Sequence, residues 1–232
     1  WYIIENNKFF LKNIFTIFLV LLVFVLIDGY LQFFLGKNLL GYEYDGSRLS
    51  GIFGDEKILG SFLSRTLPIF FGLTVMLYSK NKAYIIFSLI LLILIDILIY
   101  ITGERTAFFN LLLFSLIIIV FTNKWKLIRL ITIGISFMCI LLISQINTGT
   151  YERMITKTIQ QIYYLNHTEI LKSKPNIFSI QHQVVYQSAF KIFLDHPIFG
   201  IGPKMFREVC KDEKYQIKVE EDHSINGCQS HP

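Results

Sequence analysis

The sequence has 232 residues, of which 53% are hydrophobic and only 17% are charged, and its mean hydropathy is +0.51. A soluble domain of this size needs more charge to cover its surface, so the composition excludes an ordinary soluble protein. The net charge of +5 does not indicate nucleic-acid binding, because the Lys and Arg residues lie in short turns between apolar runs rather than on one basic face.

Long apolar runs dominate the first two thirds of the chain. A helix needs about 20 mostly apolar residues to cross the roughly 30 Å hydrocarbon core of a bilayer. The runs are apolar on every side, whereas strands of a membrane barrel alternate polar and apolar residues. The sequence therefore predicts an all-α polytopic bundle of about five transmembrane helices, at about 11–34, 58–78, 84–102, 106–122 and 127–146.

Lysine and arginine in the short loops predict the orientation of this bundle, because loops rich in these residues stay in the cytoplasm. The segments before the first, third and fifth spans carry this excess, and they contain Lys8, Lys12, Lys80, Lys82, Lys124, Lys126 and Arg129. The N-terminus is therefore predicted to be cytoplasmic. The loop 36–57, the turn 103–105 and everything after about 147 are predicted to lie on the opposite side.

Residues 1–146 are thus expected to form the transmembrane domain, and residues 147–232 a separate region outside the membrane. Two amphipathic helices are predicted in this region, at 151–165 and 183–194, and the second ends before Pro197. Because the chain begins at Trp1 rather than Met and ends in a polar stretch, we expect it to be part of a longer protein.

Ionisable residues within membrane spans are costly and often functional. Asp28, Arg65 and Asp96 all fall within about 10 Å of the predicted outer surface at 1.5 Å per residue, and no charge is expected in the inner halves of the spans. Arg48 and Arg105 belong to outer loops at the same level. Arg65 could pair with Asp28 or Asp96 for structural reasons alone. The alternative is an anion-binding pocket, because guanidinium groups suit phosphate oxygens.

Cys210 and Cys228 both fall in the outer region, where oxidising conditions favour a predicted disulfide, whereas Cys139 is expected to pack within a span. A metal site formed by these two cysteines with His223 and His231 lacks a tight paired spacing, so no metal is predicted.

His231 is the candidate general base, because a histidine near the arginines can accept a proton at neutral pH. His182, His196 and His223 are rivals that spacing does not exclude.

The sequence resembles the O-antigen polymerase/ligase superfamily of bacterial envelope glycan transferases. Four stretches carry the resemblance in the expected order: RLSGIFGDE at 48–56, GERTA at 103–107, FLDHPIFGIGPKMFR at 193–207 and CQSHP at 228–232.

The resemblance implies a metal- and cofactor-independent glycosyltransferase of GT-C-like architecture in the bacterial inner membrane. Its donor would be a polyprenyl-diphosphate-linked glycan at the periplasmic face, and its acceptor a glycan or a lipid A–core. By carry-over, Arg48 and Arg105 would bind diphosphate and His231 would activate the acceptor. Depth adds Arg65 to the diphosphate site, and Glu56 is an alternative base. Family members usually have about ten or more spans, which implies further helices.

Two other classes of protein remain as alternatives. A transporter or flippase for an anionic lipid-linked solute would explain charges within the spans, but it predicts repeat symmetry near the membrane midplane, which the sequence lacks. A structural membrane subunit would make those charges purely stabilising.

Overall fold

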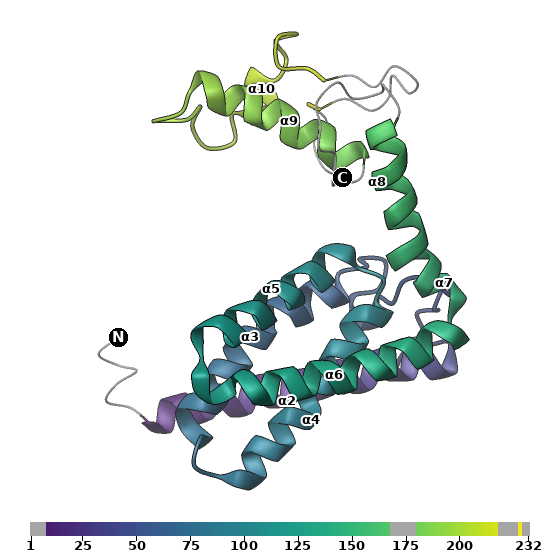
Figure 1. The fold of residues 1–232 in the computed structure, drawn as a ribbon, viewed down its shortest axis with the longest axis vertical. Helices are drawn as coiled ribbons and strands as arrows, with labels where there is room; N and C mark the ends of the chain where they lie inside the picture. Colours follow the sequence, from purple (N-terminus) through teal and green to yellow (C-terminus); the bar gives the residue numbers. More distant parts are fainter. Residues whose placement is uncertain (1–7, 168–179, 218–226, 229–232) are drawn as a thin grey trace. The chain divides into compact units, whose positions relative to one another are not determined.

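The computed structural model describes residues 8–167, 180–217 and 227–228, and these residues are predominantly helical (Figure 1). The chain divides into two compact units, Trp1–Met154 (unit 1) and Ile155–Pro232 (unit 2). Unit 1 thus extends beyond the predicted boundary at 146/147. The predicted all-α class is confirmed.

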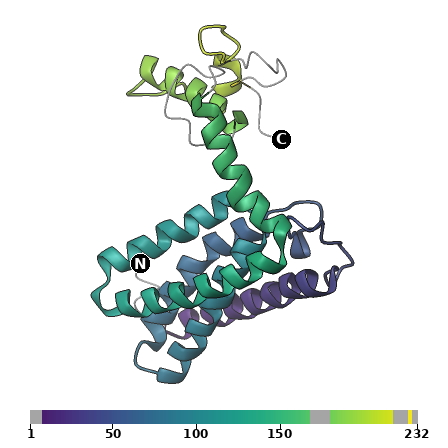
Figure 2. The ribbon, with the colours of Figure 1, turned by 45° about the vertical axis from the view of Figure 1, so that its right-hand side comes forward.

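Unit 1 is a bundle of apolar helices that fall on the predicted spans to within a few residues (Figure 2). Its long helices are α2 (Lys8–Leu35), α3 (Leu59–Tyr78), α4 (Lys82–Ile101), α5 (Arg105–Phe121) and α6 (Asn123–Ile146). Among the described residues, four of these helices are long and apolar enough to cross a membrane, and α5 is shorter, with 17 residues. The chain is a multi-pass membrane protein.

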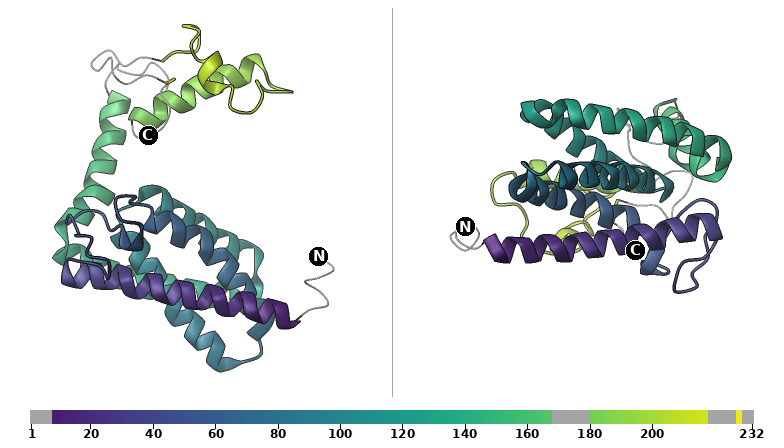
Figure 3. Two further views of the ribbon diagram at one scale, coloured as in Figure 1. Left: turned by 180° about the vertical axis from the view of Figure 1, so that it is seen from behind. Right: turned by 90° about the horizontal axis from the view of Figure 1, so that it is seen from below.

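Helix α4 is the centre of the bundle. It contacts α2, α3, α5 and α6, and 56% of its most apolar stretch is buried, against 17% for α6. Helices α2 and α6 lie on opposite sides of it (Figure 3). The Asn81 side chain caps α4 by accepting hydrogen bonds from the backbone N–H groups of Ala83 (3.1 Å) and Tyr84 (3.4 Å).

Three loop segments predicted to share one side of the membrane meet at one end of the bundle. The Tyr44 hydroxyl, in the loop 36–58, accepts a hydrogen bond from Asn147 Nδ2 (2.6 Å) and lies 3.2 Å from Thr150 Oγ1. Gly103 lies against the backbone of Ser47. Short helices complete this end: η1 (Gly51–Phe53), α7 (Thr148–Tyr151) and the π-helical turn η2 (Glu152–Thr156).

A buried ion pair joins α4 to α6 and corrects two expectations. Both carboxylate oxygens of Asp96 accept hydrogen bonds from Arg129, at 2.9 and 3.0 Å, and both residues are 2% exposed. Arg129 was assigned to a cytoplasmic loop, but it lies within α6, so the expectation that the inner halves carry no charge is wrong. The expected pairing of Arg65 with Asp96 is also wrong, because both carboxylate oxygens of Asp96 are bonded to Arg129.

Asp28 does not pair with Arg65 either. Its carboxylate accepts hydrogen bonds from the Leu39 backbone N–H (3.0 Å) and from Asn38 Nδ2 (3.4 Å), so it holds the loop after α2 against that helix. The side chain is fully buried.

Unit 2 contains α8 (Lys157–His167), α9 (Ile180–Asp195) and α10 (Phe206–Val209). Its small apolar cluster joins Ile192 of α9 to Cys210 and Tyr215. The Tyr215 hydroxyl donates a 2.7 Å hydrogen bond to Asp195, which closes the segment after α9 back onto that helix.

We predict that Asp96→Ala destabilises unit 1, because it leaves the Arg129 guanidinium buried without its carboxylate partner. Loss of one partner of a buried pair costs about 3–5 kcal/mol, which lowers Tm by roughly 10 °C for a protein of this size. Thermal unfolding of the purified protein measures this change. Arg65→Ala, which removes an exposed helical arginine, is the matched control and should leave Tm within about 2 °C; equal losses would contradict the interpretation.

Candidate functional site

Three arginines lie together at the end of unit 1 where the loop segments meet. Arg48 comes from the loop after α2, Arg105 begins α5, and Arg153 lies in η2. Arg105 donates hydrogen bonds from Nε (3.2 Å) and Nη2 (3.0 Å) to the carbonyl of Arg153. Arg153 in turn donates from Nε to the carbonyl of Gly103 (3.0 Å). We call these three residues the arginine cluster.

Gly103 lies in contact range of two arginines of the cluster, Arg48 and Arg153. Its φ of +69° is in the left-handed region that glycine adopts without strain. A Cβ atom at this position would collide with the carbonyl oxygen of Ser47, and it would lie 3.2 Å from Arg153 Cδ and 3.4 Å from Arg48 Cγ. The absence of a side chain therefore allows both arginines to approach the turn before α5.

Arg48 is held by the loop that carries it. Its Nη2 donates a 2.6 Å hydrogen bond to the carbonyl of Lys57, and its backbone N–H donates to Asp45 Oδ1 at 2.7 Å. Asp45 also pairs with the Lys57 ammonium group. Burial alone would raise the pKa of Asp45, but the hydrogen bonds from Lys57, Ser47 and Arg48 lower it well below its usual value. Arg48 Nε is buried without a hydrogen-bond partner among the described residues.

The arginine cluster concentrates positive charge in a partly buried place. Burial lowers the pKa of Arg153, and the charges of Arg48 and Arg105 lower it further, whereas Asp45 and Glu104 oppose the shift. Guanidinium groups nevertheless remain protonated at any physiological pH. Three neighbouring cations repel one another, so an anion bound among them would relieve this repulsion.

Glu104 is part of the scaffold beneath the arginine cluster. Its carboxylate accepts hydrogen bonds from the backbone N–H groups of Gly60 (2.7 Å) and Ser61 (3.0 Å) and from the Ser61 hydroxyl (2.6 Å). These donors are at the N-terminus of α3, where backbone N–H groups have no helical partner. Glu104 thereby fixes the start of α5 to the start of α3.

A family comparison matches residues 88–231 to the model described as O-antigen ligase. This match covers more than half of the 232 residues. The chain belongs to the O-antigen ligase family. Its class is therefore that of an enzyme of the glycosyltransferase or ligase type acting on envelope glycans. No curated protein and no solved structure matches the chain.

The O-antigen ligase match includes Arg105 and Arg153 but begins after Arg48. Arg48 and Arg105 are both predicted site residues, and both lie close to Arg153. Arg153 was not among the predicted site residues, although it follows the last span by seven residues, on the side where the other two are expected. The predicted order of spans and loops already places Arg153 on the same side of the membrane as Arg48 and Arg105, so this position could have identified it from the sequence.

Two other proposed site residues lie apart from these contacts. Arg65 is exposed on α3, and it forms no ion pair within the part of the chain that the structure describes. Glu56 is exposed in the loop 36–58, next to Lys57, whose carbonyl Arg48 contacts. Glu56 is therefore one residue away from a contact of Arg48, whereas Arg65 is eight residues further along the chain than Lys57.

Of the four candidate histidine bases, two lie within the described residues and two outside them. His231 and His223 lie outside the described residues. His182 is half-buried on α9, with its ring 6.2 Å from that of Tyr186, and His196 is exposed just after α9.

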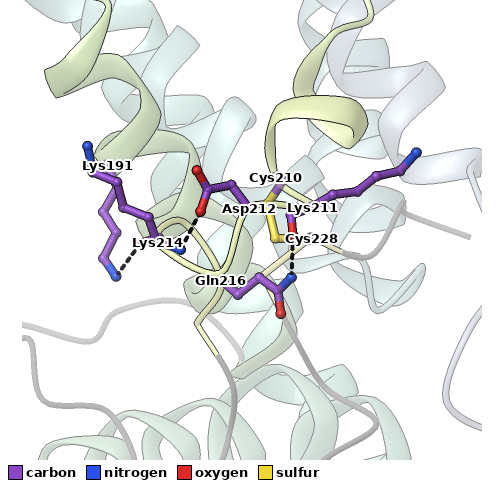
Figure 4. The surroundings of a disulfide bond; sticks show 7 residues. All are labelled: Lys191, Cys210, Lys211, Asp212, Lys214, Gln216 and Cys228. Atoms are coloured by element: carbon purple, nitrogen blue, oxygen red, sulfur yellow. Dashed lines mark hydrogen bonds between the residues drawn. A yellow bond between two sulfur atoms is a disulfide. The ribbon is translucent and has the colours of Figure 1, made fainter.

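Cys210 and Cys228 form a disulfide in unit 2, with Cα atoms 5.4 Å apart (Figure 4). Around it, Gln216 Nε2 donates to the carbonyl of Lys211 (3.0 Å), and the backbone N–H of Lys214 donates to Asp212 (3.0 Å). Because both thiols are used in this bond, they are not available together as thiolate ligands, as the rejected metal site required.

We predict that Gly103→Ala disrupts the arginine cluster. The new methyl group meets Ser47 and requires a left-handed alanine, which costs more than about 1 kcal/mol. Tm should fall by at least about 2–4 °C. Gly134→Ala is the control, because a Cβ there meets nothing within 4 Å, and it should leave Tm unchanged or raise it. Equal Tm values for the two variants would contradict the packing described here.

Proposed function

We propose that the chain transfers a glycan from a polyprenyl-diphosphate-linked donor to a glycan or lipid A–core acceptor. Membership of the O-antigen ligase family supports the reaction class. The arginine cluster is the observation that supports the donor, because three guanidinium groups at one end of a membrane bundle suit a diphosphate attached to a lipid.

In this reaction the acceptor hydroxyl attacks the anomeric carbon of the donor sugar. The bond between that carbon and the diphosphate oxygen breaks, a glycosidic bond forms, and the acceptor proton passes to a base. Negative charge develops on the leaving diphosphate. Arg48, Arg105 and Arg153 would stabilise this charge, a role that elsewhere contributes several kcal/mol, and no metal ion is then required for it.

Backbone carbonyls orient the arginine cluster in a way that fits this role. Arg48 donates to the Lys57 carbonyl, Arg105 to that of Arg153, and Arg153 to that of Gly103. A carbonyl fixes the direction of a guanidinium group without cancelling its charge. The cluster is thus preorganised for a charged leaving group.

The arginine cluster end of unit 1 is proposed to face the periplasm across the bacterial inner membrane. The lysine-rich segments 79–82 and 122–126 support this orientation, because they lie beyond the opposite ends of α3 and α5. At that level a lipid-linked diphosphate headgroup would be presented to the arginines while its polyprenyl chain stayed in the hydrocarbon.

We predict that Arg48→Ala, Arg105→Ala and Arg153→Ala each reduce glycan transfer by about 10²–10³-fold in kcat, by analogy with the loss of one donor to a developing anion. The lysine variants should retain part of the activity, since they keep the charge but lose the planar fork. Transfer of a lipid-linked glycan in vesicles reconstituted with the intact protein measures this. Arg65→Ala, at the exposed arginine that depth assigns to the diphosphate site, tests that assignment separately, and Lys80→Ala, beyond the opposite end of α3, is the control.

Normal transfer by all three cluster variants would overturn the proposed donor site. The transporter alternative makes a different prediction for the same vesicles. It requires movement of the lipid-linked glycan between leaflets with no new glycosidic bond.

For the base, we predict that His231→Ala lowers kcat by about 10²–10⁴-fold and removes the acidic limb of the pH–rate profile. Glu56→Gln should leave both nearly unchanged. The reverse outcome would assign the proton transfer to Glu56, which is near Arg48 in the loop 36–58. Transfer rates between pH 5 and pH 9 distinguish the two residues.

A further inference from the structure

In the described part of unit 2, helix α9 has a buried side and, along its C-terminal half, an exposed apolar side opposite to it. On the buried side, Val184, Ser188 and Ile192 are at most 4% exposed, and Ile192 packs against Cys210 and Tyr215. These residues anchor α9 to the rest of unit 2. A helix anchored in this way ordinarily presents polar residues on its other side.

The other side of α9 is instead lined with large apolar residues. At about 100° per residue, Tyr186, Phe190, Phe193 and Leu194 fall within one stripe opposite the buried side. Phe190, Phe193 and Leu194 are 60%, 54% and 59% exposed, and the rings of the two phenylalanines stack 6.3 Å apart.

The turn directly after α9 carries two further exposed apolar side chains. Ile198 and Phe199 are 83% and 96% exposed, which makes Phe199 the most exposed large apolar side chain in the described part of the protein. Exposed apolar surface of this extent, when it is contiguous, marks a place where a partner or a membrane binds. We call the stripe on α9 together with Ile198 and Phe199 the α9 face.

The charges near the α9 face indicate the kind of partner. Lys191 on α9, and Lys204 and Arg207 after it, are exposed cations that form no ion pair with any described residue. The remaining cations of this segment are already paired: Lys211 with Glu208, and Lys214 with Asp195. Lys191 Nζ donates a 3.5 Å hydrogen bond to the Lys214 carbonyl, which leaves its charge uncompensated. Aromatic side chains near lysine and arginine that lack an ion pair are typical of the boundary between lipid headgroups and acyl chains.

We propose that the α9 face inserts into the headgroup–acyl boundary of the bilayer that unit 1 spans. Unit 2 continues directly from unit 1 at Ile155, so it remains tethered to a membrane-embedded bundle. The phenylalanines would enter the acyl region, while Lys191, Lys204 and Arg207 would reach the lipid phosphates. Only the membrane assignment is needed for this proposal, which is independent of the proposed glycan transfer.

Spin labels on the intact protein test this directly. In a Cys139→Ala background, Phe193→Cys and Phe199→Cys are labelled without reductant, so that the Cys210–Cys228 disulfide stays intact, and the protein is reconstituted in phosphatidylcholine–phosphatidylglycerol vesicles. Phe137→Cys, at a 57% exposed position within α6, provides a reference in the acyl region. Glu213→Cys, at an exposed acidic position of unit 2, provides a reference in water.

Labels at Phe193 and Phe199 should collide more with oxygen than with a water-soluble nickel chelate, with a ratio between those of the two references. A ratio equal to that at Glu213 would overturn the proposal. Shielding from both reagents would also overturn it, because the face would then be covered by protein, from a second copy or from another segment of the chain.

Discussion

A bilayer offers no hydrogen-bonding partners, and this constraint explains where the polar side chains of unit 1 lie. Asp96 and Arg129 satisfy each other within the bundle. Asp28 and Glu104 are also buried, but they accept hydrogen bonds from backbone N–H groups at one end of the bundle. At that end, Asp28 and Glu104 therefore hold the loops in place, and residues of the arginine cluster extend from these loops.

The distinction between these carboxylates and the arginine cluster is functional. A buried carboxylate surrounded by backbone N–H groups has its charge already solvated by the protein. A guanidinium group that donates to a carbonyl, as Arg48 does to Lys57, is oriented while it keeps its full charge. Preorganised charge of this kind binds a developing anion with little rearrangement, which is the requirement for stabilising a diphosphate leaving group.

Hydropathy alone placed all the long helices of unit 1, because a membrane span is determined by length and composition and needs no knowledge of its neighbours. Tertiary pairing was harder to predict. The two lysines before Arg129 favour a loop position for it, and only the packing of α4 on α6 reveals Asp96 as its partner. Depth along α3 places Arg65 at the level of the predicted site but does not say which way its side chain points; in the structure that side chain is exposed.

The proposed stabilisation of the leaving group and the proposed proton transfer belong to different units. The arginine cluster belongs to unit 1, whereas His231 follows Cys228 by three residues in the sequence of unit 2. Cys228 is fixed to Cys210, and the backbone N–H of Gly227 donates a 2.8 Å hydrogen bond to the carbonyl of Ile217. Opening the disulfide would therefore release Cys228, the last described residue before His231, and leave the arginine cluster of unit 1 intact, so the two proposed roles can be tested separately.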